Sequence, residues 1–190
     1  MRIGGRHACS FPEMAPPESS SDEQSREERL EIARRYRERR GSELRALASR
    51  CVEGDVVAAG EFSTVPTEAL AAVPGVGMLL LPMARRRSRK AGLPPKLLLA
   101  LTGEQLHALK LEPADLRRDE VAVSPARSWP RPEVSVERTG RAFMRDRLAL
   151  SVPDADEPLT LYAPPLVTNP WSAEVVRLLG GDAPEPLDLT

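Results

Sequence analysis

The sequence predicts an α+β fold: a seven-stranded antiparallel barrel capped by a C-terminal helix and preceded by an N-terminal helical arm. Two short apolar runs within 96–111 flank a polar triplet that contains a glycine, which is typical of a β-hairpin. The segment 134–137 alternates apolar and polar residues, as a half-buried strand does. An amphipathic helix is indicated at 170–179 by apolar residues recurring every three or four positions.

Composition places limits on the class of protein. The chain has 190 residues, 41% of them hydrophobic, and a net charge of -1, which suits one domain with a real core. Such a balance argues against a strongly basic nucleic-acid binder. No apolar run reaches the roughly 18 residues of a membrane span, and Cys9 and Cys51 form neither a disulfide framework nor a metal-ligand spacing. We therefore expect a cytoplasmic protein.

The N-terminal part is predicted as a tail and an arm. Residues 1–22 are rich in Pro, Ser and charge, and we expect them to be disordered. Residues 23–52 have the composition of a helix. We expect Gly41 and Ser42 to divide this arm, with Ser42 capping a second helix that docks on the domain. The first helix, which contains most of the arginines, should be solvated.

The domain is predicted over 53–181, followed by a disordered acidic tail at 182–190. Pro125 is expected to break the fourth strand, and 139–141 to form a turn. Its seven strands are predicted at 55–62, 97–101, 106–111, 121–129, 134–137, 144–152 and 159–162.

Three details of the domain carry specific expectations. The run 97–101 is apolar at every position, so its strand should be covered on both faces. Asp146 falls on the same face as Leu148 and Leu150, a conflict that a bulge or register shift would resolve. The last helix has Asn169 as N-cap and Pro170 at its first position, and two glycines at 180–181 should end it. Its apolar stripe is Trp171, Val175, Leu178 and Leu179.

This layout resembles pleckstrin-homology-like (PH-like) domains. Several short sequence segments are similar to segments of small uncharacterised bacterial proteins of that superfamily. The likeness covers residues 53–180 and implies a non-catalytic binding module for a protein partner or an anionic membrane. PH-like domains that bind lipid take their phosphate-binding cations from the loop between the first two strands. A long apolar insert replaces that loop here, so the resemblance places no phosphoinositide site on named residues. The similar segments are Gly92-Leu93-Pro94, Leu99-Ala100-Leu101-Thr102, Leu106-His107-Ala108-Leu109, Ser128-Trp129-Pro130-Arg131 and Asn169-Pro170-Trp171.

A basic cluster in that insert is the sharpest candidate for partner contact. It follows an almost wholly apolar segment at 76–84, which would insert into the surface of an anionic membrane as an apolar anchor. At about 1 kcal/mol per cation, five cations contribute at most roughly 5 kcal/mol, so a second signal would be required for stable binding. The alternative is a solvated loop with cations that favour solubility. The cluster consists of Arg85, Arg86, Arg87, Arg89 and Lys90.

Two other classes of function remain open. The arginines at 34–40 suggest contact of the arm with nucleic acid, but Glu31, Glu38 and Glu43 dilute their charge. An enzyme of an unrecognised class is the other alternative, although the sequence contains no catalytic motif.

The remaining candidate groups favour structural roles. His107 lies within a predicted strand and is expected to be a half-buried sheet residue. His7 and Cys9 offer two metal ligands where zinc needs four, and the acidic residues at 154–157 lack the glycine of a calcium loop. We expect no catalytic residue, cofactor or metal. The function predicted is a non-catalytic interaction module that binds a protein partner or associates peripherally with a membrane, in an oligomeric state that the sequence leaves open.

Overall fold

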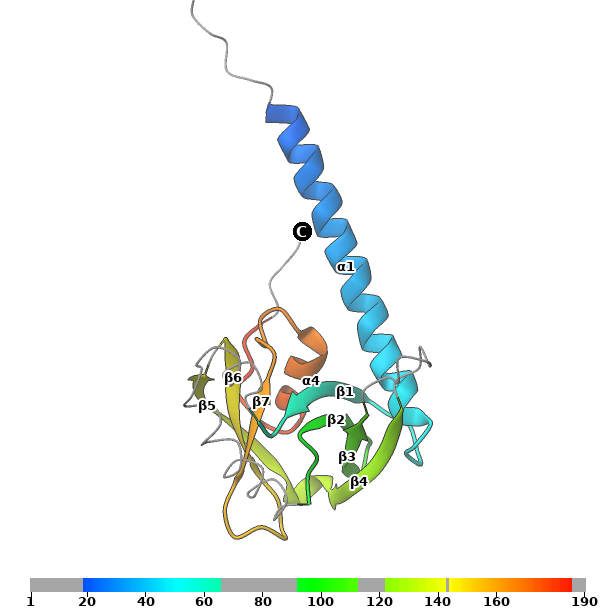
Figure 1. Cartoon of the computed structure of the whole chain (residues 1–190), viewed down its shortest axis with the longest axis vertical. Helices are drawn as coiled ribbons and strands as arrows, with labels where there is room; N and C mark the ends of the chain where they lie inside the picture. The colour runs from blue at the N-terminus through cyan, green and yellow to red at the C-terminus, as the bar shows by residue number, and fades with distance from the viewer. Residues whose placement is uncertain (1–18, 66–91, 113–121, 143, 186–190) are drawn as a thin grey trace, which may run out of the picture.

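The computed structural model describes residues 19–65, 92–112, 122–142 and 144–185, with the backbone alone described at 19–26. These residues form two α-helices and seven strands (Figure 1). The elements are α1 (Ser19–Ser49), β1 (Ala58–Ser63), β2 (Lys96–Leu101), β3 (Gln105–Leu111), β4 (Val123–Pro130), the 3-10 helix η1 (Arg131–Glu133), β5 (Ser135–Ala142), β6 (Arg145–Ser151), β7 (Leu159–Ala163) and α4 (Pro170–Leu178).

All seven strands belong to one antiparallel sheet in the order β4-β3-β2-β1-β7-β6-β5. Strand β1 joins the two halves, because it pairs with β2 over its full length and with β7 at Ser63, opposite Tyr162. The predicted α+β class and the antiparallel sheet are therefore confirmed. The first strand begins at Ala58, three residues later than predicted.

The sheet is not closed into a barrel, and the sequence prediction was wrong on this point. Strands β4 and β5 are the two edges of the sheet and do not pair with each other. Between them the chain turns through η1, where Pro130 and Pro132 have no N–H to donate to a neighbouring strand. The N–H of Arg131 binds the carbonyl of Glu104 at 2.7 Å, which fixes this corner to the β2–β3 turn. The corner thus directs β5 towards β6.

A single apolar cluster nevertheless collects residues from all seven strands and from α4. It forms because the open sheet curls, so that the two halves and the helix enclose one volume (Figure 1). Burial of apolar side chains is the main favourable term in folding, and this cluster holds the domain together. Its members include Phe62, Leu97, Leu106, Trp129, Val136, Leu148, Leu161 and Val175.

Strand β2 is buried on both faces, as its unbroken apolar run predicts. Leu97, Leu99 and Leu101 belong to the cluster beneath α4. Leu98 and Ala100 point to the opposite face, where they belong to a second cluster with residues of α1. The hairpin with β3 is also confirmed, with Leu97 opposite Lys110 and Leu101 opposite Leu106.

Helix α1 is continuous, so the predicted division at Gly41 and Ser42 was wrong. The hydroxyl of Ser42 bonds back to the carbonyl of Arg39 at 2.8 Å and caps no second helix. An ion pair between Arg39 and Glu43 spans the glycine and, at about 0.2–0.5 kcal/mol, offsets part of the roughly 1 kcal/mol that a glycine costs inside a helix. Helix α1 also begins at Ser19, inside the segment 1–22 that was predicted to be disordered.

Two local predictions at β4 and β5 also need correction. Pro125 does not break β4, which is an edge strand and pairs only with β3. Pro125 lies next to a register shift, and its missing N–H removes no hydrogen bond to a strand on the other side. The segment 139–141 is not a turn but part of β5, which continues to Ala142. Strands β6 and β7 are connected by the loop at 152–158.

Helix α4 packs against β1 at close range. A Cβ atom on Gly60 of β1 would approach the Cα of Ser172 to 2.8 Å, so a glycine is required there. Arg131 donates to the carbonyl of Leu178 at 3.2 Å, which satisfies a free carbonyl at the helix end. Gly180 has φ 81° and ends the helix as predicted. The side-chain amide of Asn169 occupies the N-cap position but bonds to the carbonyl of Pro165 instead of capping the helix.

Candidate binding surfaces

The basic cluster Arg85, Arg86, Arg87, Arg89 and Lys90 lies outside the residues that the structure describes, as does the apolar segment 76–84. The same holds for residues 68–73, where the sequence predicts a short helix capped by Thr67 and ended by Pro74. Its contact with an anionic surface stays a prediction. Two other surfaces stand out in the described part of the chain. One is centred on Asp146 in the β5–β6 hairpin, and the other is the outer part of α1.

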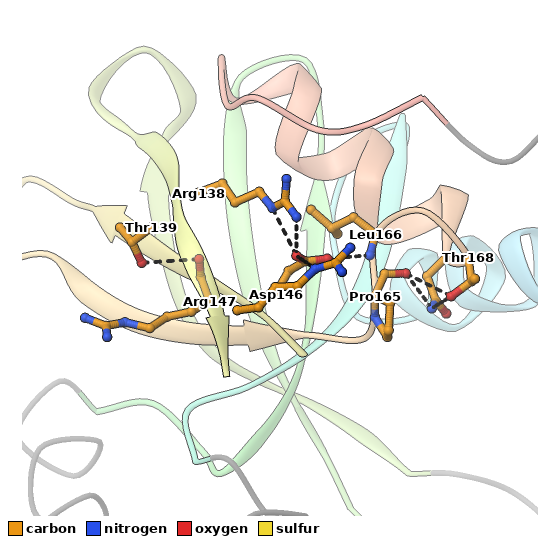
Figure 2. A network of polar contacts seen from close by, with 9 residues as sticks. Arg138, Thr139, Asp146, Arg147, Pro165, Leu166 and Thr168 are labelled. Atoms are coloured by element: carbon orange, nitrogen blue, oxygen red, sulfur yellow. Dashed lines mark hydrogen bonds and ion pairs between the residues drawn. The ribbon is translucent and has the colours of Figure 1, made fainter. Parts of the chain in front are cut away.

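Asp146 is a fully buried carboxylate on the inner face of β6. Its Oδ2 accepts a hydrogen bond from the N–H of Leu166 at 2.7 Å. Its Oδ1 accepts two from Arg138, at 3.0 and 2.7 Å, and a longer one of 3.3 Å from Arg141. Figure 2 shows Arg138 and Leu166 meeting the carboxylate from different sides, while Arg147 points away from it. A buried charge is tolerated when it is paired and hydrogen-bonded in this way.

A bulge in β5 brings the two arginines to the same carboxylate. Arg138 lies opposite Leu148 and Arg141 lies opposite Asp146, with Thr139 as the extra residue between them. In a regular strand, residues three apart face opposite sides of the sheet. The extra residue restores both arginines to one side. The predicted register shift therefore exists, but it lies in β5 and leaves Asp146 on the inner face with Leu148 and Leu150.

The pKa of Asp146 reflects a competition between burial and its donors. Burial by itself raises the pKa of this carboxyl. The hydrogen bonds from Leu166, Arg138 and Arg141, together with the positive charge of Arg138, outweigh burial and hold the pKa below its ordinary value. Asp146 is therefore ionised at neutral pH and holds two guanidinium groups in place.

The tip of this hairpin exposes an apolar side chain in an unfavourable backbone conformation. Met144 is 85% exposed and has φ 59°, where glycine or asparagine is the usual occupant. The side chain of Arg141 is 61% exposed, and Arg147 is exposed on the other face of β6. The whole hairpin carries four arginines against two acidic residues. We define the hairpin tip surface as Arg138, Arg141, Met144 and Arg147.

Helix α1 supplies the second surface, because only its last turns are fixed to the domain (Figure 1). Leu44 and Ala48 are fully buried against the sheet, and Arg40 forms an ion pair with Glu61 of β1. We call residues 27–39 the outer arm. None of them is buried.

The outer arm is helical and well supplied with charge. Three ion pairs at i, i+4 link arginines to glutamates along α1, at 2.8 to 3.3 Å. Such pairs stabilise a solvated helix by about 0.2–0.5 kcal/mol each. Ile32 and Tyr36, one turn apart, are 60% and 62% exposed. The outer arm thus has a charged surface, on which arginines pair with glutamates of the same helix, and two exposed apolar side chains.

Other candidate groups have structural partners. His107 is half-buried in β3 as predicted, and burial lowers its pKa, so it is neutral at physiological pH. Asp154 of the predicted acidic loop accepts a hydrogen bond from the indole N–H of Trp129 at 2.7 Å and pairs with Arg127 at 2.9 Å. Among the described residues, no three His, Cys, Asp or Glu side chains come together as they would around a metal ion.

Comparison of the chain with models of protein families and with curated proteins finds no match. Within the described ranges, no helix has both the length and the apolar character needed to traverse a bilayer.

Proposed function

We propose that the chain is a non-catalytic binding module with a PH-like fold. The strand order, with seven antiparallel strands each paired to its neighbour and a C-terminal helix over the curled core, supports the PH-like assignment. The seven strands and the terminal helix were part of the layout on which the resemblance in the sequence was based, whereas the closed barrel of that layout is not observed. The absence of a metal-ligand cluster in the described part of the chain is compatible with this reading and decides nothing about catalysis.

The proposed contact is between the hairpin tip surface and an anionic phospholipid bilayer, to which the protein binds peripherally. The observation that carries this proposal is the exposed Met144 with arginines on either side of it. The apolar side chain would enter the interface, and the guanidinium groups would meet lipid phosphates. Since Asp146 already holds Arg138 and Arg141, little side-chain entropy would be lost on binding.

The expected affinity of this surface alone is low. Because Asp146 compensates one of the three arginine charges, the net charge of about +2 near an anionic surface contributes roughly 2 kcal/mol, and burial of one methionine adds about 1.5–3 kcal/mol at most. Stable attachment therefore needs a further contact, for which the cluster at Arg85–Lys90 is the predicted source. A protein partner is the second candidate, and the exposed pair Ile32 and Tyr36 favours it.

Co-sedimentation with vesicles tests the membrane proposal. The full chain should sediment with phosphatidylserine-containing vesicles and remain in solution with neutral phosphatidylcholine vesicles. Replacing Arg141 and Arg147 by glutamine should weaken binding about fivefold per arginine, since each contributes about 1 kcal/mol. Met144→Ser should weaken it further. Equal sedimentation with neutral vesicles, or binding that these changes leave intact, would refute the proposal.

Matched substitutions elsewhere control for general effects of charge and hydrophobicity. Arg45 on α1 and Arg50 just after it are exposed and lie outside the β5–β6 hairpin, and their double change to glutamine removes the same charge. Val57 is an exposed apolar residue, 46% accessible, outside the hairpin. Val57→Ser should leave vesicle binding unchanged.

A further inference from the structure

We infer that two copies of the chain associate through their outer arms, side by side and antiparallel. This interface is separate from the hairpin tip surface and does not depend on the proposed membrane contact. Its starting point is the position of Ile32 and Tyr36. Counting about 100° of rotation per residue, they lie roughly 80–120° around α1 from Leu44, which faces the sheet. The domain of the same chain therefore leaves this face of the helix open.

The charges of the arm are segregated along its length. Residues 27–31 contain three glutamates and one arginine, whereas residues 34–40 contain five arginines and one glutamate. Ile32 lies at the boundary between the acidic and the basic parts, and Tyr36 lies one turn further along, within the basic part. The sequence of the arm is therefore self-complementary about its middle.

The helix dipole does not account for this arrangement. Acidic residues near the start of a helix and basic residues near its end are favourable, but the effect falls off within the first and last turns. The described charged segments, 27–31 and 34–40, lie in the interior of α1, which runs from Ser19 to Ser49. Ion pairs with glutamates engage Arg34, Arg35, Arg39 and Arg40, but by sequence the basic part contains five arginines and one glutamate and therefore has a net positive charge.

A second copy of the arm supplies the complementary pattern. In an antiparallel pair related by a two-fold axis at position 34, the acidic part of each arm lies along the basic part of the other. Position 32 of one copy then lies opposite position 36 of its partner, so that Ile32 packs against a tyrosine. A parallel pair would place like charges together, which is unfavourable. The two domains extend to opposite ends of the pair.

Two exposed apolar residues per copy make a small interface. It is well below the area that permanent dimers bury, so the association should be reversible and sensitive to salt. Sedimentation equilibrium of the full chain in reducing buffer, over a range of concentrations, should show a monomer–dimer equilibrium that shifts towards monomer as salt is raised. A single monomeric species across the range would overturn the inference.

Charge reversal provides the decisive test. One variant changes Glu27, Glu28 and Glu31 to arginine, and a second changes Arg35, Arg37 and Arg39 to glutamate. Each alone should weaken self-association at least tenfold, because like charges then face each other. An equimolar mixture of the two should associate again. Since lost helicity would not be repaired by mixing, renewed association of the mixture would support a direct contact between arms. If circular dichroism shows that both variants stay helical, failure of the mixture to associate would refute that contact.

Cross-linking distinguishes the two orientations. With Cys9 and Cys51 replaced by serine, a mixture of Ile32→Cys and Tyr36→Cys chains should form mixed disulfides faster than either chain forms its own. Preferential self-linking of Ile32→Cys would indicate a parallel pair and contradict the inference. Val57→Ser removes an exposed apolar residue away from the arm and should not change the association.

Discussion

Asp146 on β6 binds the backbone N–H of Leu166 at 2.7 Å, across twenty residues of sequence. This bond ties the edge hairpin to the loop that leads from β7 into α4. The other carboxylate oxygen is occupied by Arg138 and Arg141, so the buried charge has donors on two sides (Figure 2). This carboxylate therefore adds a polar link between the hairpin and the core to the pairing of β6 with β7.

The two arginines should contribute unequally to stability. Arg138 makes two hydrogen bonds to Asp146 and its side chain is 26% exposed, whereas Arg141 makes one long bond and is 61% exposed. Arg138→Gln should lower the free energy of unfolding by about 2–3 kcal/mol, since it leaves a buried carboxylate poorly compensated. Arg141→Gln should cost less than about 1 kcal/mol. Urea denaturation measures both, and equal losses would contradict the assigned contacts.

The low pKa of Asp146 predicts a specific loss of stability in acid. Its folded-state pKa lies below the ordinary value of 3.8, so the ionised form stabilises the fold fully above that value. This contribution is lost as the pH falls below 3.8 through the folded-state pKa. Unfolding free energies of the wild type and of Asp146→Asn should therefore converge as the pH is lowered from 6 to 2. A constant difference over this range would contradict the prediction.

Gly60 should not tolerate a side chain. An added Cβ would lie 2.8 Å from the Cα of Ser172, where backbone atoms leave no room to adjust. Gly60→Ala should destabilise the protein by about 1–3 kcal/mol by displacing α4 from β1. Gly103→Ala in the β2–β3 turn is the matched control, because nothing lies within 4 Å of its added Cβ. Thermal unfolding followed by circular dichroism should show a lower midpoint for the Gly60 variant alone.

Gly41 should behave in the opposite way. It lies inside α1, and an added Cβ meets nothing within 4 Å. Gly41→Ala should stabilise the helix by about 1 kcal/mol, because alanine loses less backbone entropy than glycine. Far-ultraviolet circular dichroism should show equal or higher helicity. Gly41→Pro should reduce helicity by breaking the arm at this point. A gain in helicity from proline would show that α1 is interrupted here.

Local chemistry accounts for the elements that the sequence predicted well. The unbroken run in β2 predicted burial on both faces, since a strand covered on two sides needs no polar face. Gly180 adopts the positive φ that a helix stop favours, and Trp171 and Val175 are buried as the apolar stripe of α4 predicted. Leu178 of the predicted stripe is only half-buried, whereas Val176, which lies outside that stripe, is buried.

The candidate surfaces were not predicted, because they depend on register. Thr139 to Arg141 has the composition of a turn, and only pairing with β6 makes it a bulged strand with two arginines on one carboxylate. Asp146 looked misplaced on an apolar face for the same reason. Its donors come from positions eight, five and twenty residues away. The available signal for this ion-pair site was two arginines, Arg138 and Arg141, that closely precede Asp146 in the sequence.

The sequence by itself determined the class of fold, the β2–β3 hairpin and the ends of α4, since these depend on interactions between residues close in the chain. Only the tertiary structure decided that the sheet stays open, that α1 is one helix and that Asp146 is buried as an ion. Helix α1 stays continuous across Gly41, which the Arg39–Glu43 ion pair spans. The other two features depend on pairing between distant segments: the N–H of Arg131 with the carbonyl of Glu104, and the N–H of Leu166 with Asp146. Such contacts become favourable only after the chain has folded, because their cost in loop entropy must first be offset by burial of the core.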